Sequence, residues 1–163
     1  MKKQKIFIAC DTTNLNKVKK IMSQSKTNKI KIGYKFGLEF MNSKNGRKFI
    51  SSIKKRIIFV DLKLNDTVNT MLSAVKALRD LKINYLTVHI SSGLAALRAV
   101  KRVSGKIKIV GVTTLTSLNN KDLKLIGYNK SVKNLVTHQA KLAKKAALDA
   151  LVCSPYEVSS VRK

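Results

Sequence analysis

Short apolar runs rich in β-branched residues alternate with longer segments of helical periodicity, and this alternation is the feature that most constrains the fold. The runs lie at residues 5–11, 29–37, 56–63, 84–90, 106–115 and 149–154. Apolar residues at spacings of three and four mark the intervening segments, at residues 15–25, 46–55, 67–81, 93–103 and 131–148. Nearly continuous apolar strands are typical of parallel sheets that are covered on both faces. The sequence therefore predicts repeated βα units.

Polar residues decide between the two architectures that repeated βα units allow, an open doubly wound sheet and a closed eight-stranded barrel. A barrel places its chemistry at the carboxyl ends of successive strands, whereas an open sheet gathers it near one switch point. Such residues occur at or near the end of every run: Asp11, Lys35, Asp61, Lys63, His89, Thr114, Thr116 and Ser154. We therefore predict an α/β fold of the TIM (β/α)8 barrel type, with about six of the eight units present, as a single incomplete barrel domain over residues 1–163.

The charge balance is strongly basic. Thirty-four Lys and Arg residues against eight Asp and Glu residues give a formal net charge of +26. Such a charge attracts nucleic acids, acidic membranes and phosphorylated small molecules. Because the lysines are spread from Lys2 to Lys163, we interpret most of them as solvated surface and predict no specific nucleic-acid partner.

The sequence also bears on compartment and metal content. Cys10 and Cys153 are far apart, and no Cys/His cluster has metal-ligand spacing. The apolar run that follows the basic start is shorter than the core of an export signal. No segment approaches the roughly 18 apolar residues of a membrane span. We expect a soluble, cytoplasmic protein without a metal site or membrane segment.

The stretch FVDLKLNDTVNT, residues 59–70, places three charged residues directly after an apolar strand. Charges that are buried at such a position are tolerated only if they pair with opposite charges or serve the function of the protein. Asp61 and Lys63 are two residues apart, so strand alternation predicts that both side chains face the barrel mouth. Asp66 follows in the loop before a helix that begins at residues 67–70, and Lys35 ends the neighbouring strand. We predict a cluster of these two ammonium groups and two carboxylates, alternating in sign.

This set of residues resembles the orotidine 5'-phosphate decarboxylase family. The family's DxKxxD signature corresponds to Asp61, Lys63 and Asp66, its lysine after the second strand to Lys35 in GYKFGLEF, and its first-strand aspartate to Asp11 in ACDTTN. TVHISSG, VTTLTSL and LVCSPYEV are similar to the ends of the family's fourth, fifth and sixth strands. A single DxKxxD is weak evidence because related phosphosugar enzymes share it, whereas six matches in order are specific.

The resemblance implies decarboxylation of orotidine 5'-monophosphate to uridine 5'-monophosphate and CO2 without a cofactor, the last step of de novo UMP biosynthesis. The family places Lys63 at the carbon that receives the proton and Asp61 near the departing carboxylate. Lys35 and Asp11 are expected at the ribose hydroxyls. Lys63, Asp61, Asp66 and Lys35 are thus the catalytic candidates.

The resemblance further implies a homodimer, in which Asp66 and Thr70 complete the site of the neighbouring subunit. Thr116 and Ser117 are candidates for the pyrimidine edge. The full set of candidate substrate-binding residues is Asp11, Lys35, Asp61, Thr67, Asn69, Thr70, Thr116 and Ser117.

The chain departs from the family pattern at loop positions and at its end. Asn65 and Val68 replace the usual His and Pro, and Leu94 follows Gly93 where a second glycine is common. The sequence ends at VRK, without the seventh and eighth strands that carry the family's phosphate-binding Gln, Arg and Gly residues. We expect a truncated sequence, two unpaired strand edges and little or no activity of the 163-residue chain alone.

Several residues also allow purely structural interpretations. The DxKxxD charges could be an ion-pair network at a strand end, and Asp11 could cap the helix that begins near residue 13. Thr116 and Ser117 could simply end a strand. His89 is expected to be a hydrogen-bonded barrel residue, and His138 is expected at the surface.

Two other functions stay open. One is a different phosphosugar lyase of the same barrel type, such as a hexulose phosphate synthase or a ketogulonate phosphate decarboxylase. Those enzymes use a metal and usually have an acidic residue where this chain has Phe59. The other is a basic nucleic-acid-binding domain or an inactive remnant, whose binding to nucleic acid would depend steeply on salt.

Overall fold

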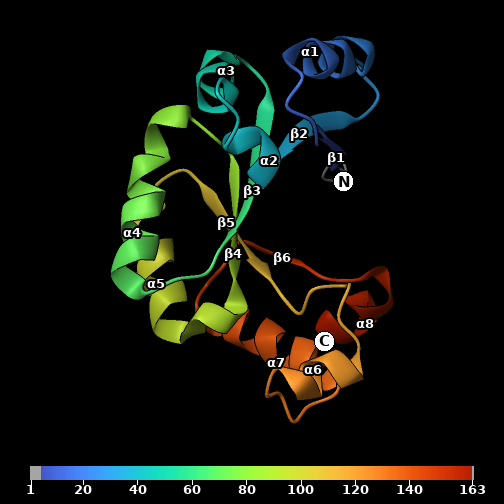
Figure 1. Ribbon diagram of the computed structural model, residues 1–163, viewed down its shortest axis with the longest axis vertical. Helices are drawn as coiled ribbons and strands as arrows, with labels where there is room; N and C mark the ends of the chain where they lie inside the picture. The colour runs from blue at the N-terminus through green and yellow to red at the C-terminus, as the bar shows by residue number, and fades with distance from the viewer. Residues whose placement is uncertain (1–4, 163) are drawn as a thin grey trace.

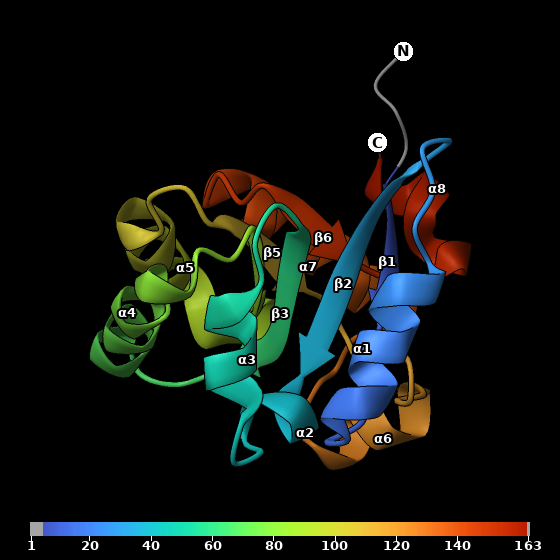
Figure 2. The same ribbon diagram turned by 90° about the horizontal axis from the view of Figure 1, so that it is seen from above.

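The computed structural model describes residues 5–162, which form one parallel sheet of six strands with helices on its outer side (Figures 1 and 2). The strands pair in sequence order and every neighbouring pair is parallel. An open doubly wound sheet would reverse its order at a switch point, so that alternative is wrong. The fold is six βα units of a (β/α)8 barrel. The strands are β1 (Lys5–Ala9), β2 (Lys31–Gly37), β3 (Ile57–Leu64), β4 (Tyr85–His89), β5 (Lys108–Val112) and β6 (Ala150–Val152).

Five helices lie within the predicted helical segments: α1 (Leu15–Gln24), α3 (Gly46–Ser52), α4 (Val68–Ala77), α5 (Gly93–Val103) and α7 (Val132–Lys145). Helices α4 and α5 pack side by side along the sheet (Figure 1). Two short helices, α2 (Leu38–Met41) and α6 (Asn120–Leu125), were not predicted. The short helix α8 (Val158–Val161) lies at the end of the described residues. These residues also contain the 3-10 turns η1 (Arg79–Leu81), η2 (Ile90–Ser92) and η3 (Pro155–Glu157).

The start of α1 settles one structural interpretation of Asp11. The side chain of Asn14 accepts hydrogen bonds from the backbone N–H groups of Asn16 and Lys17, at 3.0 and 3.1 Å. Asn14 is therefore the N-cap. The interpretation of Asp11 as the cap of this helix is wrong, and its carboxylate is available for other contacts.

The core lies between the sheet and the helices, where Val60, Leu86 and Ile109 of the strands and Val75 and Leu97 of the helices are fully buried. Alternate strand residues face the other side of the sheet. There the ring of Phe7 lies 5.1 Å from that of Phe59 and 5.2 Å from that of Tyr85, in edge-to-face contacts.

All strands run in the same direction, so their carboxyl ends meet at one end of the half-barrel. Strands β1 and β6 are its two edges among the described residues. The prediction of a single domain over residues 1–163 includes residues 1–4 and 163, which lie outside the described residues, and it stays a prediction.

Candidate active site

Four charged side chains form a chain of ion pairs across the carboxyl ends of β1, β2 and β3. The Lys35 ammonium lies 3.3 Å from Asp11 Oδ1 and 3.5 Å from Asp61 Oδ2. The Lys63 ammonium lies 3.0 Å from Asp61 Oδ2. The signs alternate in the order Asp11, Lys35, Asp61, Lys63. Only 13% of the Asp61 side chain is exposed, so this central carboxylate is the most desolvated of the four and depends on both cations.

Asp66 is not a member of this chain of ion pairs. Its Oδ1 accepts a hydrogen bond from the backbone N–H of Thr67 at 2.6 Å, and among residues 5–162 it forms no ion pair. The prediction that Asp66 supplies the second carboxylate of the cluster is therefore wrong for a single chain. Asp11 supplies it instead, because β1 and β2 are neighbours in the sheet.

Lys63 reaches Asp61 for a different reason than strand alternation. Lys63 has a left-handed backbone (φ 49°), and the pairing of β3 with β4 is irregular between Val60 and Leu64. A left-handed conformation costs a non-glycine residue about 1–2 kcal/mol. The contact was predicted, but its geometry depends on this local departure from a regular strand.

Thr87 of β4 holds the two catalytic candidates together and was not singled out from the sequence. The backbone N–H of Lys63 donates to Thr87 Oγ1 at 2.8 Å, and that hydroxyl donates to Asp61 Oδ1, also at 2.8 Å. Thr87 is fully buried. This buried hydroxyl therefore fixes the backbone of Lys63 and the carboxylate of Asp61 at the same time. The signal in the sequence is a polar residue within the apolar run YLTVHI, which is ambiguous because threonine is also a common strand residue.

Opposing effects act on the pKa of Asp61. Burial alone would raise this pKa, but hydrogen bonds from Lys63 and Thr87 and the charges of Lys63 and Lys35 outweigh burial and lower it below its usual value of 3.8. The pKa of His89 is also lowered, first by burial and then by the charge of Lys63. The Asp61 carboxylate is thus ionised at neutral pH, and the His89 imidazole is kept neutral.

The lowered pKa of Asp61 predicts a loss of stability in acid. A carboxyl group whose pKa is lower in the folded state stabilises the fold above its unfolded pKa, and this contribution is lost as the pH falls through the folded value. The free energy of unfolding should therefore fall below about pH 4, and Asp61→Asn should lose less over the same interval. Urea unfolding at pH 5, 4 and 3 measures the difference. Thr87→Val removes one of the hydrogen bonds that lower the pKa of Asp61, together with the bond from the Lys63 N–H, and should give an intermediate slope. Parallel curves for wild type and Asp61→Asn would contradict the assignment.

The start of α4 presents polar side chains beside Lys63. The hydroxyls of Thr67 and Thr70 lie 3.0 Å apart, and Asn69 is exposed on the same turn. A hollow of about 300 Å³ separates this turn from the end of β3. Its lining residues are Leu62, Lys63, Leu64, Asn65, Asp66, Thr70, Met71 and Ala74.

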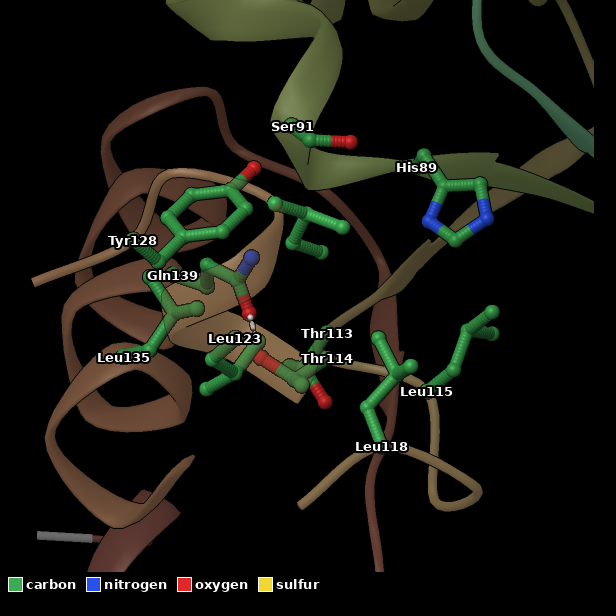
Figure 3. Close-up of a pocket in the computed structure, with 11 residues that line it drawn as sticks. His89, Ser91, Thr113, Thr114, Leu115, Leu118, Leu123, Tyr128, Leu135 and Gln139 are labelled. Atoms are coloured by element: carbon green, nitrogen blue, oxygen red, sulfur yellow. Dashed lines mark hydrogen bonds between the residues drawn. The ribbon is translucent and has the colours of Figure 1, made fainter. Parts of the chain in front are cut away.

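Thr116 and Ser117 lie apart from the ion pairs, exposed in a turn after β5. A small cavity of about 130 Å³ lies under this loop, between His89 and α7 (Figure 3). Thr114 Oγ1 donates to Gln139 Oε1 across it at 3.1 Å, and Leu115 and Leu118 line it. The cavity is smaller than the several hundred Å³ of ordinary ligand sites, so it cannot hold a nucleotide by itself.

The two histidines differ. His138 is exposed on α7, as predicted. His89 lies at the mouth of the small cavity (Figure 3), and its ring makes no hydrogen bond to another described residue. The expectation that it is a hydrogen-bonded barrel residue is therefore wrong.

Two absences hold for the part of the chain that the structure describes. No group of three or more His, Cys, Asp or Glu side chains there could hold a metal ion. No helix within residues 5–162 has the length and apolar character needed to cross a membrane.

The geometry agrees with the comparison to known families. Residues 4–163 match the sequence model of the orotidine 5'-phosphate decarboxylase / HUMPS family. The chain belongs to this family. Among curated relatives, the orotidine 5'-phosphate decarboxylase of Sphingopyxis alaskensis is 40% identical over 161 residues, which are 97% of this chain and 70% of the relative. That of Wolbachia pipientis subsp. Culex pipiens is 40% identical over 163 residues, again 97% of this chain and 70% of the relative.

Solved structures of the family share the fold. The orotidine 5'-phosphate decarboxylase of Lactobacillus acidophilus superposes with a TM-score of 0.87 at 29% identity, covering 98% of this chain and 75% of that protein. The enzyme of Methanocaldococcus jannaschii, crystallised with the inhibitor BMP, gives a TM-score of 0.80 at 21% identity and covers 98% and 73% of the two chains. This second likeness concerns the fold alone.

Proposed function

We propose that this chain carries the reactive charges of an orotidine 5'-phosphate decarboxylase, which converts orotidine 5'-monophosphate to uridine 5'-monophosphate and CO2. The observation that carries the proposal is the chain of ion pairs Asp11–Lys35–Asp61–Lys63 at the carboxyl end of the barrel strands. Fixed charges of this kind are what a decarboxylation without an organic electron sink requires, because the electron pair of the broken bond stays on the pyrimidine ring.

Lys63 is the proposed proton donor. Decarboxylation breaks the bond between the ring carbon and the carboxylate carbon, CO2 leaves, and the ring carbon keeps the pair. An ammonium directed at that carbon stabilises the developing negative charge and then supplies the proton. The Lys63 ammonium donates a hydrogen bond to the Asp61 carboxylate at 3.0 Å, and this contact holds the ammonium in position.

Asp61 has a second proposed effect, on the carboxylate of the substrate. Two like charges about 4 Å apart at an effective dielectric constant near 20 repel by roughly 4 kcal/mol. That repulsion disappears when CO2 leaves, so it favours the forward step. Lys35 and Asp11, which contact each other at 3.3 Å, are the proposed partners of the ribose hydroxyls.

The roles of four residues at the start of α4 depend on a second subunit. We propose a cytoplasmic homodimer in which Asp66 and Thr70 complete the neighbouring site, with Thr67 and Asn69 beside them. All four side chains are exposed, and Asp66 and Thr70 line the hollow next to Lys63, which supports this arrangement. Thr116 and Ser117 are the proposed partners of the pyrimidine edge, on an exposed turn at the same end of the barrel.

The barrel position before the signature argues against the other phosphosugar lyases. Phe59 occupies it, and its ring packs against Phe7 and Tyr85 at 5.1 and 5.8 Å. This is an aromatic cluster rather than a carboxylate site, so the side chain can supply no metal ligand at this point.

Joining this chain to the remaining C-terminal part of the Sphingopyxis alaskensis relative provides the test. The completed barrel should release CO2 from orotidine 5'-monophosphate and form uridine 5'-monophosphate in equal amounts. The relative's C-terminal part alone is the control. A folded barrel that cleaves a hexulose or ketogulonate phosphate, but leaves orotidine 5'-monophosphate intact, would overturn the proposal.

A further inference from the structure

A cavity of about 630 Å³ lies at the other end of the barrel from the ion pairs. Its lining residues are Arg79, Lys82, Ile83, Asn84, Ser104, Gly105, Lys106 and Ile107. They precede β4 and β5 directly, so the cavity lies at the amino ends of these strands. Strand β4 has five residues, which at about 3.3 Å per residue separates the two ends by roughly 16 Å.

Three cations line this cavity without a carboxylate partner. Among residues 5–162, Arg79, Lys82 and Lys106 form no ion pair. Asp80, which follows Arg79 in the sequence, contacts Arg47 at 2.7 Å. Asp149, whose carboxylate accepts a hydrogen bond from the backbone N–H of Ile109 at the start of β5, contacts Lys101 at 2.6 Å. A concave surface lined by charges of one sign concentrates counter-ions.

The guanidinium of Arg79 extends toward the second loop. A Cβ atom placed on Gly105 would lie 3.7 Å from Arg79 Nε, so this side chain spans from the first residue of η1 to the loop before β5. Both η1 and α5 end here, and each helix end carries a partial negative charge of at most about one half. Two such ends leave most of the three positive charges uncompensated.

Backbone N–H groups add to the positive character of the cavity. Lys82 (φ 51°) and Gly105 (φ 59°) both have left-handed backbones directly after a helical turn. The N–H groups of Ile83, Gly105 and Lys106 have no hydrogen-bond acceptor in the described structure. Successive N–H groups in such a turn form an anion-binding concavity.

The end of α7 shows that a left-handed cap does not by itself leave these groups free. Ala147 has the same conformation (φ 55°), yet its own N–H donates to Lys144 O at 3.0 Å and the next N–H, of Leu148, donates to Ala143 O at 3.1 Å. These bonds close the cap in the usual way. The two turns at the cavity leave the N–H groups of Ile83, Gly105 and Lys106 without such bonds, and these same two turns carry Lys82 and Lys106.

We propose that this cavity binds a polyphosphate group, either free or as the triphosphate end of a nucleotide. Three cations and three unpaired N–H groups match the charge and the many acceptor oxygens of such a group. The volume lies within the range of small-molecule sites. The site is separate from the proposed decarboxylase site, so neither proposal depends on the other.

The test uses the 163-residue chain labelled with ¹⁵N and titrated with inorganic tripolyphosphate, and separately with adenosine 5'-triphosphate, at about 150 mM salt. The amide signals of Lys82, Ile83, Gly105 and Lys106 should shift and saturate at one ligand per chain. The triple variant Arg79→Gln, Lys82→Gln and Lys106→Gln should weaken binding at least about tenfold, since it removes the charge-assisted hydrogen bonds. The matched control has the same net charge and carries Lys17→Gln, Lys48→Gln and Lys141→Gln on exposed helix surfaces; it should change affinity by less than about threefold.

The two ligands separate the two sources: saturation by both assigns the site to the phosphate chain, and saturation by the nucleotide alone assigns it to nucleotides. Equal weakening in the cavity variant and the control would attribute binding to overall charge and overturn the proposal. Shifts confined to residues 61–70 would place the anion at the other end of the barrel and also overturn it. The proposal is also overturned if a single-stranded oligonucleotide binds more tightly than both ligands and its binding disappears in the cavity variant. The surface would then be a nucleic-acid-binding surface.

Discussion

Lys63→Ala in the completed barrel should lower kcat for decarboxylation of orotidine 5'-monophosphate by about 10³- to 10⁴-fold. The substitution removes the proposed proton donor and the positive charge nearest Asp61, whose carboxylate now lies 3.0 Å from the Lys63 ammonium. KM should change much less, because the phosphate and ribose contacts are made by other residues. Steady-state release of CO2 from labelled substrate measures both constants.

Two further variants show whether the effect depends on position and chemistry. Lys63→Arg keeps the positive charge but replaces a compact ammonium by a guanidinium that does not give up its proton, so it should be nearly as inactive as alanine. Lys76→Ala removes a lysine from the exposed last turn of α4 and should leave kcat unchanged. Undiminished turnover by Lys63→Ala would reject the proton-donor assignment.

The elements that could be predicted from the sequence are those whose periodicity extends over enough residues. Helix α5 has the predicted bounds, residues 93–103, because its apolar stripe is regular and Gly93 begins it. Helix α2 has only four residues, so no period can be recognised in it. Helix α6 is also short, but the capping box of Asn119 and Asp122 was a recognisable signal for it.

The candidate site could be predicted as a set of residues more readily than as an arrangement. Parallel strands bring their carboxyl ends together, which places Asp11, Lys35 and Asp61 at the same edge. The left-handed backbone of Lys63 and the bridging hydroxyl of Thr87 could not be predicted, because they arise from the irregular pairing of β3 with β4. The residue pattern of a single strand does not predict where its register with the neighbouring strand shifts.

The place of Asp66 leads to the second prediction, which concerns activity shared between subunits. Asp66 is exposed and takes no part in the ion pairs of its own chain. If it completes the site of the neighbour, a dimer with Lys63→Ala in one subunit and Asp66→Ala in the other has one site with both defects and one intact site. Each variant alone should be nearly inactive in the completed barrel, whereas an equimolar mixture after subunit exchange should regain about a quarter of wild-type kcat.

The value of one quarter follows from random pairing in a two-fold symmetric dimer, since half of the dimers are mixed and each has one intact site of two. A role of Asp66 within its own subunit predicts the opposite result, because each mixed dimer would then contain one site with each defect and the mixture would stay inactive. The control pairs Lys63→Ala with Asp61→Asn, two residues in direct contact within one chain at 3.0 Å. This mixture should regain no activity, so recovery confined to the mixture with Asp66→Ala would assign that carboxylate to the neighbouring site.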